Sequence, residues 1–128
     1  MSEADVERAR AALAAFGSGD IDRLLRQFHP DFEGVVPSEL SAEPDTYRGH
    51  AGIRRYVESF REYVDGLRFV PEELIDVGDA VVVALRIEGR GRGSGAPFEQ
   101  RLANRITLRD GLIASITAFA TVDEALAP

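Results

Sequence analysis

The sequence has 128 residues, of which 45% are hydrophobic and 29% are charged, and its formal net charge is −7. This composition is typical of one folded globular domain, and we expect residues 1–128 to form it. The negative charge, with basic residues scattered along the chain, excludes a nucleic-acid partner. All 15 basic residues are arginine and cysteine is absent, which excludes lysine Schiff bases, thiol nucleophiles and disulfides.

The N-terminal segment gives the expected location of the protein. Residues 1–16 mix acidic residues and arginines, whereas a secretory signal needs a basic start and an unbroken apolar core. No apolar run approaches the length of a membrane span. We therefore expect a cytoplasmic protein with no membrane partner.

Three segments carry apolar residues at helical spacing. The first covers residues 3–16, and Ser2 with Asp5 resembles a capping box at its start. The second, residues 20–28, begins at an aspartate that can cap it and ends at a His-Pro pair. The third is expected over residues 50–64. The chain should therefore begin with mainly helical structure.

The second half of the chain is rich in β-branched and aromatic residues, which are typical of strands. Gly78-Asp79 and Asp110-Gly111 are two-residue hairpin signals that predict an antiparallel meander. Before the third helix, we expect a short strand at residues 32–37 and a polar loop at 37–47 that is placed to cover the mouth of a cavity. The meander strands are predicted at residues 67–77, 80–90, 97–109 and 112–120.

Helices followed by a meander predict an α+β fold, with the helices on one face of a curved, mostly antiparallel sheet. The glycine-rich segment at residues 90–97 joins two strands without a following helix, so it is not expected to bind phosphate. Two histidines without metal-ligand spacing do not make a metal site. We therefore expect neither a metal nor a cofactor.

Three phrases of the sequence, together with the order of the elements, resemble those of SnoaL-like proteins. They are GDIDRLLRQFHPD at residues 19–31, YRGHAGIRRY at 47–56 and ITLRDGLI at 106–113. Over essentially its whole length, the chain resembles the SnoaL-like branch of the nuclear transport factor 2-like superfamily. The resemblance implies a single cone-shaped domain, with three N-terminal helices on a curved sheet around one pocket. It does not determine a reaction, because the superfamily holds several enzyme classes and proteins without catalysis.

The resemblance can be tested against the chemistry of two superfamily members. Ketosteroid isomerase needs a general-base Asp and an oxyanion hole made from a Tyr and a protonated Asp. Matching the phrases places Val36 at the base, Ala12 at the Tyr and Asn104 at the second acid, so steroid isomerisation is rejected. Polyketide cyclases of the SnoaL type use a pocket acid on the last strands, whereas residues 112–120 contain no acid.

Strand alternation predicts a mostly apolar pocket if Asn104 points inward. Asn104 and Tyr56 would orient a ligand, Glu73 would be a base if it follows the inward alternation of its strand, and His29 is a fourth catalytic candidate. Each also has a structural explanation: a satisfied amide, a packed tyrosine, a glutamate turned outward by a bulge, or a histidine that ends a helix. The predicted lining comprises Phe32, Val36, Tyr56, Phe60, Val83, Leu85, Ile87, Leu102, Asn104, Ile106, Ile116 and Ala118.

The opposite face of the predicted sheet carries charges of both signs, and we expect a homodimer to form through it. The leading hypothesis is a protein that binds a small hydrophobic molecule. If it is an enzyme, we expect it to catalyse a proton transfer of the isomerase or cyclase type. The alternatives are a non-catalytic dimerising or ligand-carrying domain and a partner-binding domain that uses the open sheet face. Pocket volume separates ligand binding from a cone filled by its own side chains. The charged positions are Arg86, Glu88, Glu99, Arg101 and Arg105.

Overall fold

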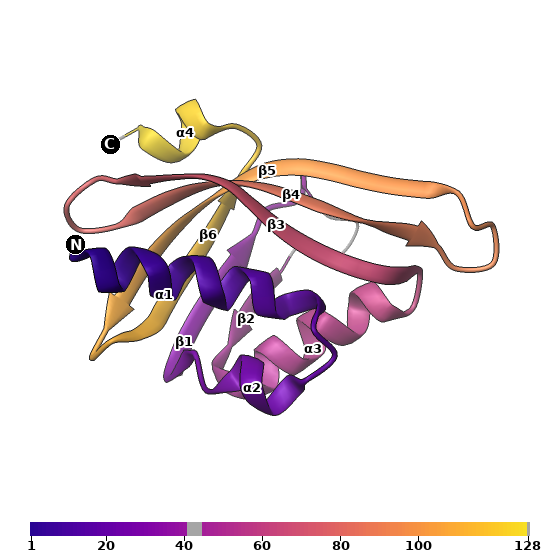
Figure 1. Ribbon diagram of the computed structural model, residues 1–128, viewed down its shortest axis with the longest axis horizontal. Helices are drawn as coiled ribbons and strands as arrows, with labels where there is room; N and C mark the ends of the chain where they lie inside the picture. The colour runs from indigo at the N-terminus through magenta and orange to yellow at the C-terminus, as the bar shows by residue number, and fades with distance from the viewer. Residues whose placement is uncertain (41–44, 128) are drawn as a thin grey trace.

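The structure is a computed structural model that describes residues 1–40 and 45–127. Helices and one six-stranded sheet form an α+β fold, as predicted (Figure 1). The elements are α1 (Glu3–Ala14), the 3₁₀ turn η1 (Ala15–Gly17), α2 (Ile21–Leu25), β1 (Phe28–Val36), β2 (Asp45–Arg48), α3 (Gly49–Arg61), β3 (Val64–Asp76), β4 (Val81–Gly91), β5 (Pro97–Arg109), β6 (Leu112–Phe119) and α4 (Val122–Leu126).

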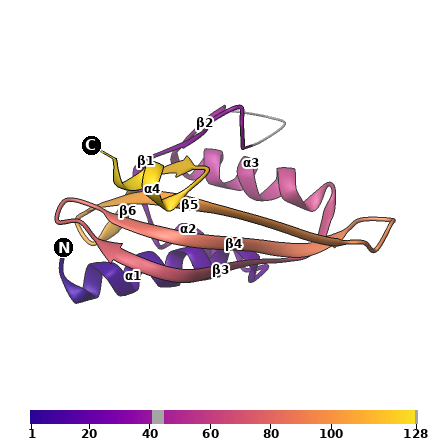
Figure 2. The same cartoon turned by 90° about the horizontal axis from the view of Figure 1, so that it is seen from above.

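The sheet has the strand order β2-β1-β6-β5-β4-β3. Neighbouring strands are antiparallel except for β1 and β6, which are parallel, so the expectation of a mostly antiparallel sheet is confirmed. In Figure 1, α1, α2 and α3 lie on one side of the sheet and α4 lies on the other. Viewed from above, α1 follows β3 and α3 lies toward β1 and β2 (Figure 2). The side that carries α1 and α3 is called the inner face below.

The helix starts agree with the sequence prediction, but the end of the second helix does not. Ser2 and Asp5 form the expected capping box at α1, and the Asp20 side chain accepts the first hydrogen bond of α2. However, α2 ends at Leu25, and Phe28 already begins β1. The prediction was wrong because Phe28 pairs with β6, and a register shift farther along β1 accommodates Pro30, which has no N–H to donate.

Two short elements were not predicted, and one helix is shorter than expected. Residues 45–48, at and just beyond the end of the predicted loop, form β2 and pair with β1; residues 41–44 of that loop lie outside the described residues. β2 has a single buried residue, Tyr47, and therefore no alternation that could reveal it. Helix α3 ends at Arg61, because Val64 already pairs with β4. The predicted group of three N-terminal helices is thus interrupted, because β1 and β2 lie between α2 and α3, and α4 follows the last strand of the sheet.

The four meander strands are confirmed, with shifts of a few residues at their ends. Asp110 and Gly111 adopt φ values of 56° and 76°, as a type I′ hairpin requires. None of the helices in the described part of the chain combines the length and the apolar character that a bilayer crossing requires.

The close approach of η1 to β3 brings an aromatic side chain over the sheet. A Cβ atom at Gly17 would lie 2.1 Å from the carbonyl oxygen of Leu67, so only glycine permits this contact. Phe16, immediately before it, stacks on Phe69 with ring centroids 4.8 Å apart. These two rings form part of the wall of the cavity described next.

Candidate functional site

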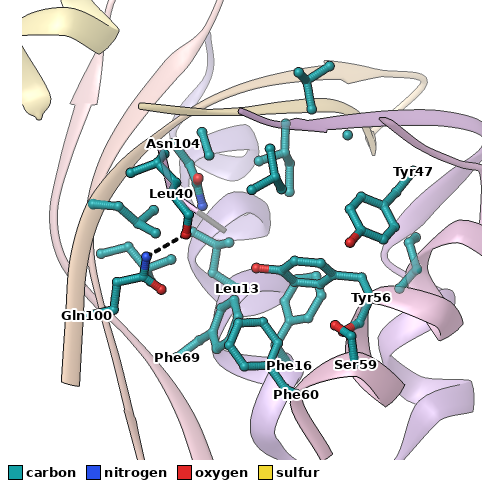
Figure 3. Close-up of a pocket in the computed structure, with 18 of the residues that line it drawn as sticks. Leu13, Phe16, Leu40, Tyr47, Tyr56, Ser59, Phe60, Phe69, Gln100 and Asn104 are labelled. Carbon is teal, nitrogen blue, oxygen red and sulfur yellow. Dashed lines mark hydrogen bonds between the residues drawn. The ribbon is translucent and has the colours of Figure 1, made fainter. Parts of the chain in front are cut away.

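A cavity of about 330 Å³ lies between α3, the η1 region and the inner face of the sheet (Figure 3). Its volume is within the range of small-molecule sites. The residues predicted to line the pocket that do border this cavity are Phe32, Val36, Tyr56, Phe60, Leu85, Leu102, Asn104, Ile116 and Ala118.

Three further residues of the predicted lining do not border the cavity. Val83, Ile87 and Ile106 are at most 1% exposed and belong to the hydrophobic core that also contains Ala9 and Leu13 of α1. Alternation correctly places these three side chains on the inner face. It does not reveal which part of the inner face is covered by packed side chains and which part borders the cavity.

Asn104 is the one buried polar residue in the described part of the chain, with 5% of its surface exposed. It lies in the middle of β5, opposite Val83 on one side and Ala118 on the other. Its amide points into the cavity, and no described residue forms a hydrogen bond with that amide (Figure 3). Buried amides in folded proteins normally have partners, so this amide is placed to bind something that enters the cavity.

Tyr56 projects from α3, and its hydroxyl also points into the cavity (Figure 3). Its ring makes edge-to-face contacts with Phe16, Tyr47 and Phe60 at centroid distances of 5.8, 5.2 and 5.2 Å. No described residue hydrogen-bonds to the Tyr56 hydroxyl. Burial, with smaller contributions from Tyr47 and Tyr63, raises the pKa of Tyr56 far above its ordinary value. The hydroxyl is therefore a neutral donor and acceptor rather than a base.

Several polar residues at the cavity were not predicted. Gln100 has the same strand parity as Asn104, and its Nε2 donates to the carbonyl oxygen of Leu40 at 2.9 Å. Leu40 itself borders the cavity, so this hydrogen bond joins β5 to the turn at residues 37–40 beside the cavity. Gln100 lies four residues before Asn104 on the same strand, so alternation could have predicted that it faces the cavity. Tyr47 also borders the cavity, but only the unpredicted strand β2 brings it there.

Glu73 is exposed and does not border the cavity. The condition for its use as a base, that it follows the inward alternation of its strand, is therefore not met. The pairing of β3 with β4 shifts between Pro71, opposite Leu85, and Glu73, opposite Ala84. This bulge reverses the side on which the following residues lie. Glu73 therefore cannot serve as a base inside the cavity.

His29 lies on β1 away from the cavity, and its side chain is 14% exposed. The backbone N–H of Asp31 donates to its Nδ1 at 3.0 Å, and Nε of Arg109 lies 3.3 Å from its Nε2. The histidine thus connects the start of β1 to the β5–β6 turn. Within the described ranges, no group of three or more His, Asp or Glu side chains is arranged to hold a metal ion.

Four of the charged residues predicted for the outer face form ion pairs with one another or with Glu72, whereas Arg105 pairs with Asp79 and donates to the carbonyl oxygen of Ala125. Arg86 contacts Glu72 and Glu88, and Arg101 contacts Glu72 at 2.7 Å and Glu99 at 3.8 Å. Part of this face is covered, because α4 packs on it. Val82, Ala103 and Ala125 form a small buried cluster under α4.

Comparison with known proteins places the chain in a family. Residues 9–116 match the SnoaL-like domain. The chain belongs to the SnoaL-like domain family. The uncharacterized protein Rv0034 of Mycobacterium tuberculosis is 29% identical over 118 residues, which cover 91% of this chain and 88% of that protein. The predicted resemblance is thereby confirmed.

Solved structures support the same fold. TerC, co-crystallized with polyporic acid, is 28% identical with a TM-score of 0.77, and the match covers 95% of each chain. TsrD from Streptomyces laurentii is 25% identical with a TM-score of 0.73, covering 92% of this chain and 89% of TsrD. A protein of ketosteroid isomerase-like fold from Catenulispora acidiphila, in complex with trimethylamine, is 19% identical with a TM-score of 0.76, covering 94% and 89%. This last match concerns the fold alone.

Proposed function

We infer that this protein binds a small, mainly hydrophobic molecule in the cavity, with Asn104 and Tyr56 as its polar contacts. The single observation that carries this inference is the buried Asn104 amide, which faces about 330 Å³ of space without a described partner. A cone filled by its own side chains would have left no such volume. The small molecule found with TerC supports the same use of the fold.

Proton transfer of the isomerase or cyclase type has less support than binding. Among the described residues that border the cavity, the one carboxylate is Glu99, which is exposed and ion-paired with Arg101. Tyr56 is kept neutral by burial, and Glu73 lies outside the cavity. A general base must reach the proton that it removes. We therefore place binding or carrying of a ligand ahead of catalysis by these residues.

The binding function is tested by native mass spectrometry and by titration with prodan, a neutral naphthalene ketone dye. We expect a retained small molecule, or one dye bound per chain with blue-shifted emission. Ala118→Leu should weaken dye binding by about tenfold or more, because it fills the cavity beside Asn104. The control Ala84→Leu makes the same change on the outer side of β4. Equal affinities for the two variants would mean that the dye binds elsewhere and would count against the proposal.

A homodimer through the part of the outer face that α4 leaves uncovered is a second proposal. Its support is the alternation of Arg86 and Arg101 with Glu72, Glu88 and Glu99, which makes the surface self-complementary. Arg101→Glu should shift the protein toward monomer in light scattering. Arg26→Glu, on the exposed end of α2, should not. A wild-type monomer at every protein concentration would refute the dimer.

A further inference from the structure

The part of the cavity wall that the structure describes is almost free of formal charge. Among the described residues that border it, Glu99 alone carries one at neutral pH. Its side chain is 53% exposed and lies 3.8 Å from Nε of Arg101, so its charge is directed to the outer face and already paired. An ion that entered the cavity would therefore lose its hydration and meet no unpaired counter-charge from the described residues, which is unfavourable for either sign.

The polar groups that do face the cavity are neutral. The Asn104 amide can donate through its NH₂ group and accept through its carbonyl oxygen, and the Tyr56 hydroxyl can do both. They come from opposite walls, β5 and α3, and both point into the same space (Figure 3). A carbonyl or hydroxyl oxygen of a ligand satisfies such groups without bringing a charge into the cavity.

The remaining wall favours flat ring systems. Phe16, Phe60 and Phe69 surround Tyr56 in a connected set of ring contacts, with Phe16 and Phe69 stacked at an interplanar angle of 17°. Aromatic surfaces interact favourably with further rings in stacked or edge-to-face geometry. Naphthalene derivatives are therefore suitable probes.

We propose that the cavity selects an uncharged ring compound bearing a carbonyl or hydroxyl oxygen, that it rejects carboxylates and amines of the same size, and that Asn104 determines this specificity. The proposal rests on the binding function inferred above and adds the charge and polar chemistry of the ligand to it.

The first test measures four probes that share one ring system by isothermal titration at neutral pH. They are methyl naphthyl ketone, ethylnaphthalene, naphthoate and naphthylmethylammonium. The ketone should bind at least about tenfold more tightly than either ion, because the described wall of the cavity offers the ions no unpaired counter-charge. Naphthoate or the ammonium binding as tightly as the ketone would overturn charge selection while leaving the binding function intact. If neither the four probes nor prodan binds, the binding function itself fails.

Asn104→Leu tests the specificity role, since it keeps the cavity apolar and roughly filled. It should reduce ketone affinity about tenfold and leave ethylnaphthalene affinity unchanged. Equal changes for the two probes would overturn the role of the amide.

A complementary variant adds a cation to the wall. Ser59 borders the cavity on α3 and is partly buried, so Ser59→Arg should raise naphthoate affinity relative to the ketone. Ala51→Arg adds the same charge at an exposed position of the same helix and should leave the ratio of the two affinities unchanged. Equal responses of the two variants would show that charge near the cavity does not control selection.

Discussion

The inner and outer faces of β4 and β5 tolerate different polar groups, although their residues alternate along the same two strands. The outer face carries Arg101, whose side chain is 62% exposed, and Arg86 and Glu88, whose side chains are 26% and 25% exposed; all three pair with neighbouring charges. The inner face carries Asn104 and Gln100, which are polar but uncharged. Pairing and hydration explain the difference, because the ions of the outer face meet opposite charges and keep part of their hydration, whereas an ion in the cavity would lose its hydration without gaining a partner among the described residues.

The largest predicted effect tests packing on the inner face. Ile106→Ala should lower the free energy of unfolding by about 2–5 kcal/mol, because Ile106 is fully buried and its truncation leaves a void. On the outer face, Arg101→Ala should change it by no more than about 1 kcal/mol, since its side chain is 62% exposed. Urea denaturation measures both. Comparable losses would remove the energetic contrast between the faces.

The second prediction places a titratable group on the inner face. In Asn104→Asp, burial should raise the pKa of the new carboxyl above its unfolded value. The unfolded chain then loses the proton at lower pH than the folded chain, so stability relative to wild type should fall as pH rises from about 4, by up to about 1.4 kcal/mol per unit, until the folded-state pKa is reached.

Urea titrations of Asn104→Asp and wild type at several pH values measure this difference. Thr117→Asp, on the other face of β6 from Ala118, is the matched control and should show a smaller pH dependence. A pH-independent difference for Asn104→Asp would mean that the site is hydrated as well as the surface.

The third prediction concerns the contact between Gln100 and the turn that precedes β2. Gln100→Leu removes the hydrogen bond to the Leu40 carbonyl and should lower stability by about 1 kcal/mol. The detached turn should also show faster hydrogen exchange at the Leu40 amide, which bonds to Pro37. Unchanged exchange would mean that the turn is held by other contacts.

The smallest predicted effect concerns an exposed pair near α3. Arg55 donates a hydrogen bond of 2.6 Å to Asp45, and this bond, with a smaller contribution from the hydrogen bond of the Thr46 N–H, holds the pKa of Asp45 below its ordinary value of 3.8. Because the folded-state pKa is lowered, the pair stabilises the fold above pH 3.8 and loses this effect as pH falls through the lower value.

Asp45→Asn should therefore reduce the urea midpoint slightly at neutral pH and not at all in strong acid. Added salt should shrink the difference at neutral pH. A difference that persists in acid would point to packing of the Asp45 side chain instead of its charge.

Local signals in the sequence were sufficient for most elements of the fold. The Ser2–Asp5 capping box, the Asp20 cap and the Asp110-Gly111 turn depend on residues close in sequence, and all three are confirmed. Alternation along β5 defined a pocket face on the condition that Asn104 points inward, and Asn104 does border the cavity. The β2 strand was missed because its pairing with β1 leaves no local pattern.

The sequence by itself thus determined the resemblance to the family, the order of most elements and which residues share a strand face with Asn104, because these follow from short-range patterns. Only the tertiary structure decided that the bulge in β3 turns Glu73 to solvent, that Val83 and Ile106 are packed while Leu102 borders open space, and that Tyr47 and Gln100 join the cavity. Such outcomes depend on contacts between residues far apart in sequence, which no local period encodes.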